Sequence, residues 1–140
     1  MKEYIDLLKQ LIATPSISKE EAEAAEIIRN FLKEKEIPFK TAENNTWAYS
    51  KNYTKGKPTI MLNSHIDTVK PAKDYTNDPF TPIEEDDKLF GLGSNDAGGP
   101  LVALLATFIH FYERTDIPFN LVFVASAEEE ISGRRGLEIV

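Results

Sequence analysis

Two short, almost uninterrupted apolar runs constrain the fold of this chain more than any other feature. They lie at residues 59–63 and 119–125, and polar residues follow each of them. Runs of this length are typical of strands buried on both faces of a mostly parallel sheet. Residues 99–112, between the two runs, are predicted to form a helix, with Pro100 in its first turn.

The rest of the chain predicts two N-terminal helices and several short strands. Apolar residues recur at helical spacing over residues 3–13, and Ser18 followed by Glu21 predicts a capping box for a second helix. Short strands are predicted around residues 39–42 and 47–50, and Asp86 with Asp87 predicts a hairpin turn. The order helices, strands, helix, strand indicates an α/β fold in which helices sandwich a mostly parallel, buried sheet.

Composition excludes several classes of function. The 140 residues contain no cysteine, which excludes disulfides and thiolate zinc sites. The formal net charge of −7 argues against a nucleic-acid-binding surface, which needs a basic stripe. No apolar run approaches the roughly 20 residues of a membrane-spanning helix, and the first residues lack the pattern of a signal peptide. We therefore expect a cytoplasmic, single-domain protein that binds neither nucleic acid nor membranes.

Three polar clusters lie where the predicted strands end or the predicted helix begins. Ser64-His65-Ile66-Asp67 follows the first apolar run, and Ser126-Ala127-Glu128-Glu129-Glu130 follows the second. Between them, residues 90–99 form a glycine-rich stretch in which Asp96 is the one charged residue. Ligand sites of α/β proteins lie at the carboxyl ends of strands, so these positions favour function.

Each cluster also has an ordinary explanation. A His-x-Asp pair is usually a surface histidine near an aspartate, and three adjacent glutamates usually lie on a solvated face. A glycine-rich turn before a helix can cradle a phosphate. However, no Gly-Lys-Ser/Thr sequence is present, and the carboxylate of Asp96 would repel a phosphate.

Taken together, the clusters supply one imidazole and several carboxylates. This ligand set suits zinc, cobalt or manganese in a hydrolytic site. Asp67 can accept the second ring N–H of His65 and so fix the tautomer that binds metal. Of the adjacent glutamates, one could bind the metal while another carries protons. The residues therefore favour a metallohydrolase.

Several ordered motifs then carry a family resemblance. They are His65-Ile66-Asp67, Asp78-Pro79-Phe80, the sequence DKLFGLGSNDAGG at residues 87–99, and Glu128-Glu129-Glu130 with Gly133 and Gly136. In this order and at this spacing they resemble the co-catalytic two-zinc aminoacylases, carboxypeptidase G, dipeptidases, and acetylornithine and succinyldiaminopimelate deacetylases. The resemblance runs from the first helix to Val140 and implies a zinc-peptidase-like catalytic domain.

The resemblance also implies a role for each site residue. His65 resembles the ligand of the first metal, and Asp67 the acid that orients it. Asp96 resembles the carboxylate that bridges both metals, and the peptide bond after it is expected to be cis. Glu129 resembles the general base, and Glu130 a ligand of the second metal.

Two features of the sequence bear on this alignment. The triple glutamate leaves an ambiguity of one residue, and Glu128 is aligned with the family's usual aspartate because this keeps the spacing to Gly133 and Gly136. Leu92 stands where the family usually has arginine, and Ala97-Gly98 where it has x-Lys. Neither position is a ligand, so the metal assignment stands.

The implied reaction is hydrolysis of the amide bond of an N-acyl amino acid. The motif wording is most similar to acetylornithine or succinylornithine deacetylases of arginine biosynthesis. An aminoacylase or dipeptidase of the same family, or a non-catalytic fragment that keeps the fold, is the alternative. A phosphohydrolase with Asp96 as nucleophile is disfavoured, because no D-x-D or nearby lysine accompanies it.

Family members carry further ligands and a lid and dimerisation domain beyond the matched region. By resemblance we expect residues 1–140 to be the N-terminal part of the catalytic domain of a longer, homodimeric protein. That protein would bind two zinc ions, with cobalt or manganese as alternatives, and a small N-acyl amino acid or dipeptide. The isolated chain would leave each metal with only two protein ligands, so we expect it to be inactive.

Overall fold

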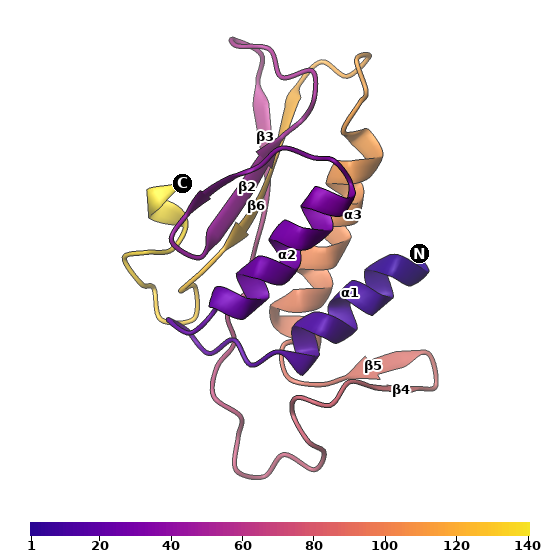
Figure 1. Cartoon of the computed structure of the whole chain (residues 1–140), viewed down its shortest axis with the longest axis vertical. Helices are drawn as coiled ribbons and strands as arrows, with labels where there is room; N and C mark the ends of the chain where they lie inside the picture. Colours follow the sequence, from indigo (N-terminus) through magenta and orange to yellow (C-terminus); the bar gives the residue numbers. More distant parts are fainter.

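A computed structural model describes residues 1–140, and the predicted helices and strands form in it with small shifts at their ends (Figure 1). The helices are α1 (Lys2–Ala13), α2 (Ala22–Glu34) and α3 (Gly99–Phe111). One sheet contains β1 (Lys40–Ala42), β2 (Asn45–Tyr49), β3 (Thr59–His65) and β6 (Asn120–Ser126), while β4 (Ile83–Glu85) and β5 (Lys88–Phe90) form a separate hairpin. None of the helices combines the length and apolar character needed to cross a membrane.

The four-stranded sheet has the order β1-β2-β6-β3, and it is mixed. Strands β3 and β6 run parallel, in register from Thr59 opposite Asn120 to His65 opposite Ser126. The β1–β2 and β2–β6 pairs are antiparallel, so the expectation of a mostly parallel sheet is wrong for these strands. For β1 and β2 the physical reason is their tight connection, since parallel strands need a long crossover.

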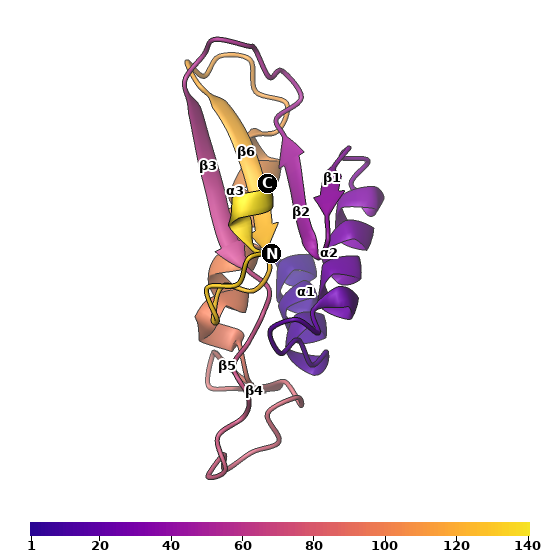
Figure 2. The same cartoon turned by 90° about the vertical axis from the view of Figure 1, so that its left-hand side faces the viewer.

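All three helices pack on one face of the sheet. The main core joins buried residues of α1, α2 and α3 to Ala48 of β2 and to Leu121, Phe123 and Ala125 of β6. Trp47, Val122 and Val124 form a smaller cluster on the opposite face. The expected sandwich is therefore only half present, because helices of this chain cover one face (Figure 2).

The two apolar runs differ in burial. Every residue of β6 is buried, as the sequence predicts for a central strand. In β3, the residues at 59–61 are exposed and burial is complete only at Ser64 and His65. The prediction that this strand is buried on both faces is wrong, because β3 lies at the edge of the sheet.

The segment between α1 and α2 corrects a further prediction. The second helix begins at Ala22, and no side chain caps its first turn. Instead of forming a capping box with Glu21, Ser18 donates its hydroxyl hydrogen to Asp67 Oδ2, at 2.7 Å. The backbone explains the difference, since Thr68 N–H donates to Ser16 O at 2.9 Å and holds this segment against the end of β3.

The predicted hairpin turn at Asp86 and Asp87 forms. Asp86 and Asp87 have φ values of 49° and 58°, the left-handed pair that a two-residue hairpin favours. Near the C-terminus, Leu137–Ile139 form a short 3₁₀ turn.

Candidate metal centre

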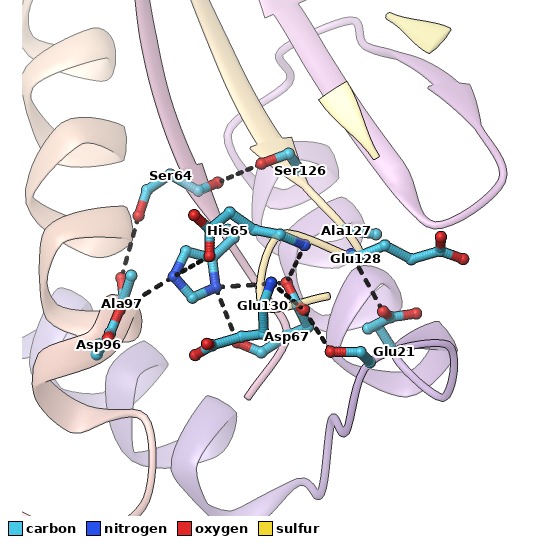
Figure 3. Close-up of polar contacts among 12 residues, drawn as sticks. Glu21, Ser64, His65, Asp67, Asp96, Ala97, Ser126, Ala127, Glu128 and Glu130 are labelled. Atoms are coloured by element: carbon cyan, nitrogen blue, oxygen red, sulfur yellow. Dashed lines mark hydrogen bonds and ion pairs between the residues drawn. The ribbon is translucent and has the colours of Figure 1, made fainter. Parts of the chain in front are cut away.

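The three polar clusters meet at the carboxyl ends of β3 and β6 (Figure 3). His65 is the last residue of β3 and lies opposite Ser126, the last residue of β6. One ligand atom from each of His65, Asp96 and Glu130 lies within 4.8 Å of the others. The predicted convergence of these three residues is therefore confirmed.

His65 is buried, and both of its ring nitrogens have polar neighbours. Nδ1 lies 2.9 Å from the carbonyl oxygen of Asp67 and 3.3 Å from its Oδ1. Nε2 lies 3.1 Å from Asp96 Oδ1 and 3.7 Å from Glu129 Oε2. The hydrogen bond to the Asp67 side chain is the largest cause that raises the pKa of His65. Burial lowers this pKa, and the net result is a pKa of about 9. Nδ1 is thus engaged by Asp67, and Nε2 faces the other carboxylates.

Asp67 is fully buried and collects four donors. Its carboxylate accepts the Ser18 hydroxyl at 2.7 Å and the backbone N–H groups of Glu129 and Glu130, each at 3.1 Å. Burial alone would raise the pKa of Asp67, but hydrogen bonds from His65, Ser18, Glu129 and Glu130 together lower it. Asp67 therefore stays ionised, and it holds both the imidazole of His65 and the backbone that carries the glutamates.

Asp96 lies in the wide turn Ser94–Gly98 that leads into α3. Gly93, just before it, has φ 75°, and a Cβ there would lie 2.7 Å from Thr68 Cγ2. The peptide bond between Asp96 and Ala97 is cis, as the resemblance implies. Ser64 donates its hydroxyl hydrogen to Ala97 O at 3.2 Å, which ties this turn to β3. The turn leaves the Asp96 side chain 77% exposed, with Oδ1 against His65.

The three adjacent glutamates point in different directions. Glu128 turns back into its own loop, where its Oε2 accepts the N–H of Arg135 at 3.2 Å (Figure 3). The Glu129 side chain is 59% exposed and reaches His65 Nε2. The pKa of Glu130 is raised, mainly by partial burial and to a smaller extent by repulsion from the Asp96 carboxylate. This geometry supports the alignment in which Glu128 is neither ligand nor base.

This set of side chains fits a divalent cation. An imidazole nitrogen and two carboxylates are ligands that Zn²⁺, Co²⁺ and Mn²⁺ accept. The carboxylates of Asp96 and Glu130 repel each other, and a cation between them would remove that repulsion. Chemically, such a cation would lie next to Glu129, a solvent-accessible carboxylate able to take up and release a proton.

Sequence reasoning missed three residues that support the centre. The sequence predicts a helix cap for Ser18 and Glu21, and its local pattern gives no role to Asn45. Asn45 accepts the N–H of Ala127 at 2.9 Å, and Glu21 accepts that of Glu128 at 3.3 Å. Local spacing carries no signal for such contacts, because the partners lie 82 and 107 residues apart.

The shifted pKa of His65 predicts a pH dependence of stability in the metal-free chain. Its folded-state pKa of about 9 exceeds the ordinary histidine pKa of 6.5, so the protonated imidazole stabilises the fold. This contribution is fully present below pH 6.5 and is lost as the pH rises through 9. Because a shift of one pKa unit corresponds to about 1.4 kcal/mol, the contribution of His65 to the free energy of unfolding is on the order of 3 kcal/mol.

The free energy of unfolding, measured by urea titration at pH values from about 6 to about 9.5, checks this prediction. The His65→Gln chain serves as control and is expected to lose most of the slope. Saturating zinc should stabilise more strongly as pH rises, because a bound imidazole must be neutral. Equal slopes for the parent and His65→Gln chains would contradict the assignment of the shift to His65.

Comparison with known proteins supplies independent information. A family model described as peptidase family M20/M25/M40 matches residues 61–139. A succinyl-diaminopimelate desuccinylase of Blochmanniella floridana is 29% identical over 97% of this chain and 38% of its own length. A probable carboxypeptidase of Emericella nidulans is 30% identical over 93% of this chain and 32% of its own length. The chain thus spans about two-fifths or less of these relatives.

Solved structures share the fold at lower identity. An M20 family metallo-carboxypeptidase from Sulfolobus solfataricus matches with a TM-score of 0.77 and 22% identity, over 94% of this chain and 32% of its own. A dinuclear metal-binding peptidase from the M20 family of Bacillus subtilis matches with a TM-score of 0.70 and 21% identity, over 96% of this chain and 37% of its own. These likenesses confirm the α/β fold class.

Proposed function

Because this chain belongs to peptidase family M20/M25/M40, we propose that the protein hydrolyses an amide bond with the help of divalent metal ions. The observation that carries the proposal is the convergence of His65, Asp96 and Glu130 within 4.8 Å, beside the accessible carboxylate of Glu129. The relatives that match most of this chain include desuccinylases and a carboxypeptidase, which supports amide hydrolysis.

Each site residue has a proposed role. His65, Asp96 and Glu130 would hold two metal ions, with Asp96 shared between them, and we propose zinc as the metal. Bound cations would polarise the amide carbonyl and make water more acidic. Glu129 accepts the proton of the attacking water and passes it to the departing amine. Asp67 holds the His65 ring with Nε2 directed at the centre.

The substrate class is an N-acyl amino acid or a dipeptide. We propose an acetylornithine or succinylornithine deacetylase of arginine biosynthesis, on the wording of the motif at residues 94–99 and of Ala127 to Glu130. The succinyl-diaminopimelate desuccinylases among the relatives support an N-succinyl substrate for this protein. The likeness to a carboxypeptidase supports a peptide substrate instead. An aminoacylase or dipeptidase is the second candidate.

The chain covers only part of the length of its relatives, which supports the proposal that it belongs to a longer protein. Since the chain spans 38% of the desuccinylase, residues 1–140 would be part of a longer protein, and we propose that they form the N-terminal part of its catalytic domain. The remaining ligands and a dimerising lid domain would then come from elsewhere in a longer protein.

A substrate panel tests the proposal. The full-length protein that contains these residues is loaded with zinc and assayed against N-acetylornithine, N-succinylornithine, N-succinyldiaminopimelate, other N-acyl amino acids and dipeptides. We expect zinc-dependent release of a free amine from one class, abolished by a chelator and restored by zinc. Zinc binding without hydrolysis of any of these amides would favour a non-catalytic protein that keeps the fold.

A further inference from the structure

The backbone that carries the glutamates is held in an unusual way. The four consecutive N–H groups of residues 127–130 are all accepted by side-chain oxygens from distant parts of the chain. The acceptors are Asn45 Oδ1 for Ala127, Glu21 Oε1 for Glu128, and the two oxygens of Asp67 for Glu129 and Glu130.

The need for these acceptors follows from the local geometry. The chain leaves the sheet after Ser126, so strand partners no longer pair its amides. Glu128 then takes a left-handed backbone conformation, with φ 54°, which turns the chain toward the centre. Buried N–H groups need acceptors, and here side chains alone supply them. The direction of the peptides at 128–130 therefore depends on where those side chains sit.

Glu21 is the least expected member of this set. It is 0% exposed, and no lysine, arginine or histidine pairs with it. Its carboxylate also accepts Lys19 N–H at 2.6 Å and Asn44 Nδ2 at 2.8 Å. A carboxylate buried without a cation is costly unless donors surround it. Although Glu21 stands at the cap position of α2, its side chain makes no cap bond to that helix. The carboxylate is directed at the loop of the metal centre instead (Figure 3).

We propose that Glu21 is a positioning residue for the metal centre. Through the N–H of Glu128, its carboxylate fixes the turn from which Glu129 and Glu130 project. This inference rests on the proposed function for the role of those two glutamates. Asn45, also 0% exposed, anchors the preceding peptide and donates to Arg135 O at 2.6 Å, so the loop is held at both ends.

Three variants of the full-length protein that contains these residues test the proposal. Glu21→Ala removes the acceptor. Glu21→Gln keeps one oxygen for the N–H of Glu128, and the half-buried Asn44 can turn its amide to pair with the new Nε2. Asn120→Ala is the matched control, since Asn120 is 1% exposed and accepts Thr54 N–H at 2.8 Å. Asn120 lies at the start of β6, the end of the strand opposite the metal centre.

Two measurements are made on each variant. The first is the Zn²⁺ dissociation constant, from a titration followed by the NMR signals of His65 and Glu130. We expect Glu21→Ala to raise it at least tenfold, in the range of residues that orient metal ligands. Glu21→Gln should stay within about threefold of the parent, as should Asn120→Ala despite its lower stability.

The second measurement is hydrogen exchange in the absence of zinc. Glu21→Ala should speed exchange at the amides of residues 128–130 at least tenfold relative to β6, while Asn120→Ala should not. A Glu21→Ala chain that is less stable yet keeps the parent's zinc affinity and exchange pattern would overturn the proposal. So would a Glu21→Gln chain as impaired as Glu21→Ala, because charge rather than the acceptor would then matter.

The exchange measurement also separates this inference from the proposed function. If the full-length parent protein fails to bind zinc at His65, the metal assignment is wrong. The exchange pattern at residues 128–130 still decides whether Glu21 positions the loop.

Discussion

Replacing Glu129 with alanine in the full-length protein is expected to lower kcat by about a hundred- to ten-thousand-fold, the usual cost of losing a general base. Metal content should remain near that of the parent. The Glu129 side chain is 59% exposed and can be truncated without leaving a buried group unpaired. Glu130→Ala should lower metal content as well as kcat, because the Glu130 carboxylate belongs to the cluster with His65 and Asp96.

Kinetics and metal analysis of the two variants, side by side, check this prediction. Glu113→Ala is the control, since Glu113 lies beyond the end of α3, where it pairs with Lys51 on the surface. If Glu129→Ala lost metal and Glu130→Ala kept it, the two roles would be exchanged.

Asp67→Ala is expected to produce the largest loss of stability in the site. It would leave the Ser18 hydroxyl, the His65 ring and two backbone N–H groups without their acceptor, a carboxylate that is itself fully buried. Removing one partner from a buried charged network typically costs about 3–5 kcal/mol. Zinc affinity should fall by about ten- to a hundredfold, as for other residues that orient metal ligands.

Urea unfolding of the 140-residue chain and zinc titration of the full-length protein measure the two effects. Asp67→Asn keeps the shape and one acceptor oxygen, and should fall between the parent and Asp67→Ala. Asp116→Ala, which removes an exposed partner of Arg114, should leave both quantities unchanged. A loss below about 1 kcal/mol for Asp67→Ala would mean that the network contributes little to folding.

The place of the candidate site could be predicted because two of its three polar clusters follow apolar runs, while the roles of its residues came from the family resemblance. The carboxyl ends of neighbouring parallel strands lie at the same edge of a sheet, so His65 and Glu130 had to approach each other once β3 and β6 paired. The glycines around Asp96 indicated a turn before a helix, and the structure has one there. Positional logic of this kind needs only the strand order and the ends of the strands.

The burial of β3 and the direction of the β1–β2 pair could not be predicted in this way. An apolar run looks the same in a central strand and in an edge strand, and only strand order distinguishes β6 from β3. The predicted capping box of Ser18 and Glu21 is wrong for a related reason. Their spacing fits a helix cap, yet Asp67 and Glu128 compete for the same side chains from 49 and 107 residues away.

The central claim is that His65, Asp96 and Glu130 form a metal site, and anomalous X-ray diffraction at the zinc edge tests it most directly. Crystals of the full-length protein that contains these residues would be grown with millimolar zinc and compared with crystals of its His65→Gln, Asp96→Asn double variant. We predict an anomalous peak within bonding distance of His65 Nε2 and of carboxylate oxygens of Asp96 and Glu130, and no peak there in the variant. Zinc bound elsewhere, with this cluster unchanged and free of anomalous signal, would contradict the account.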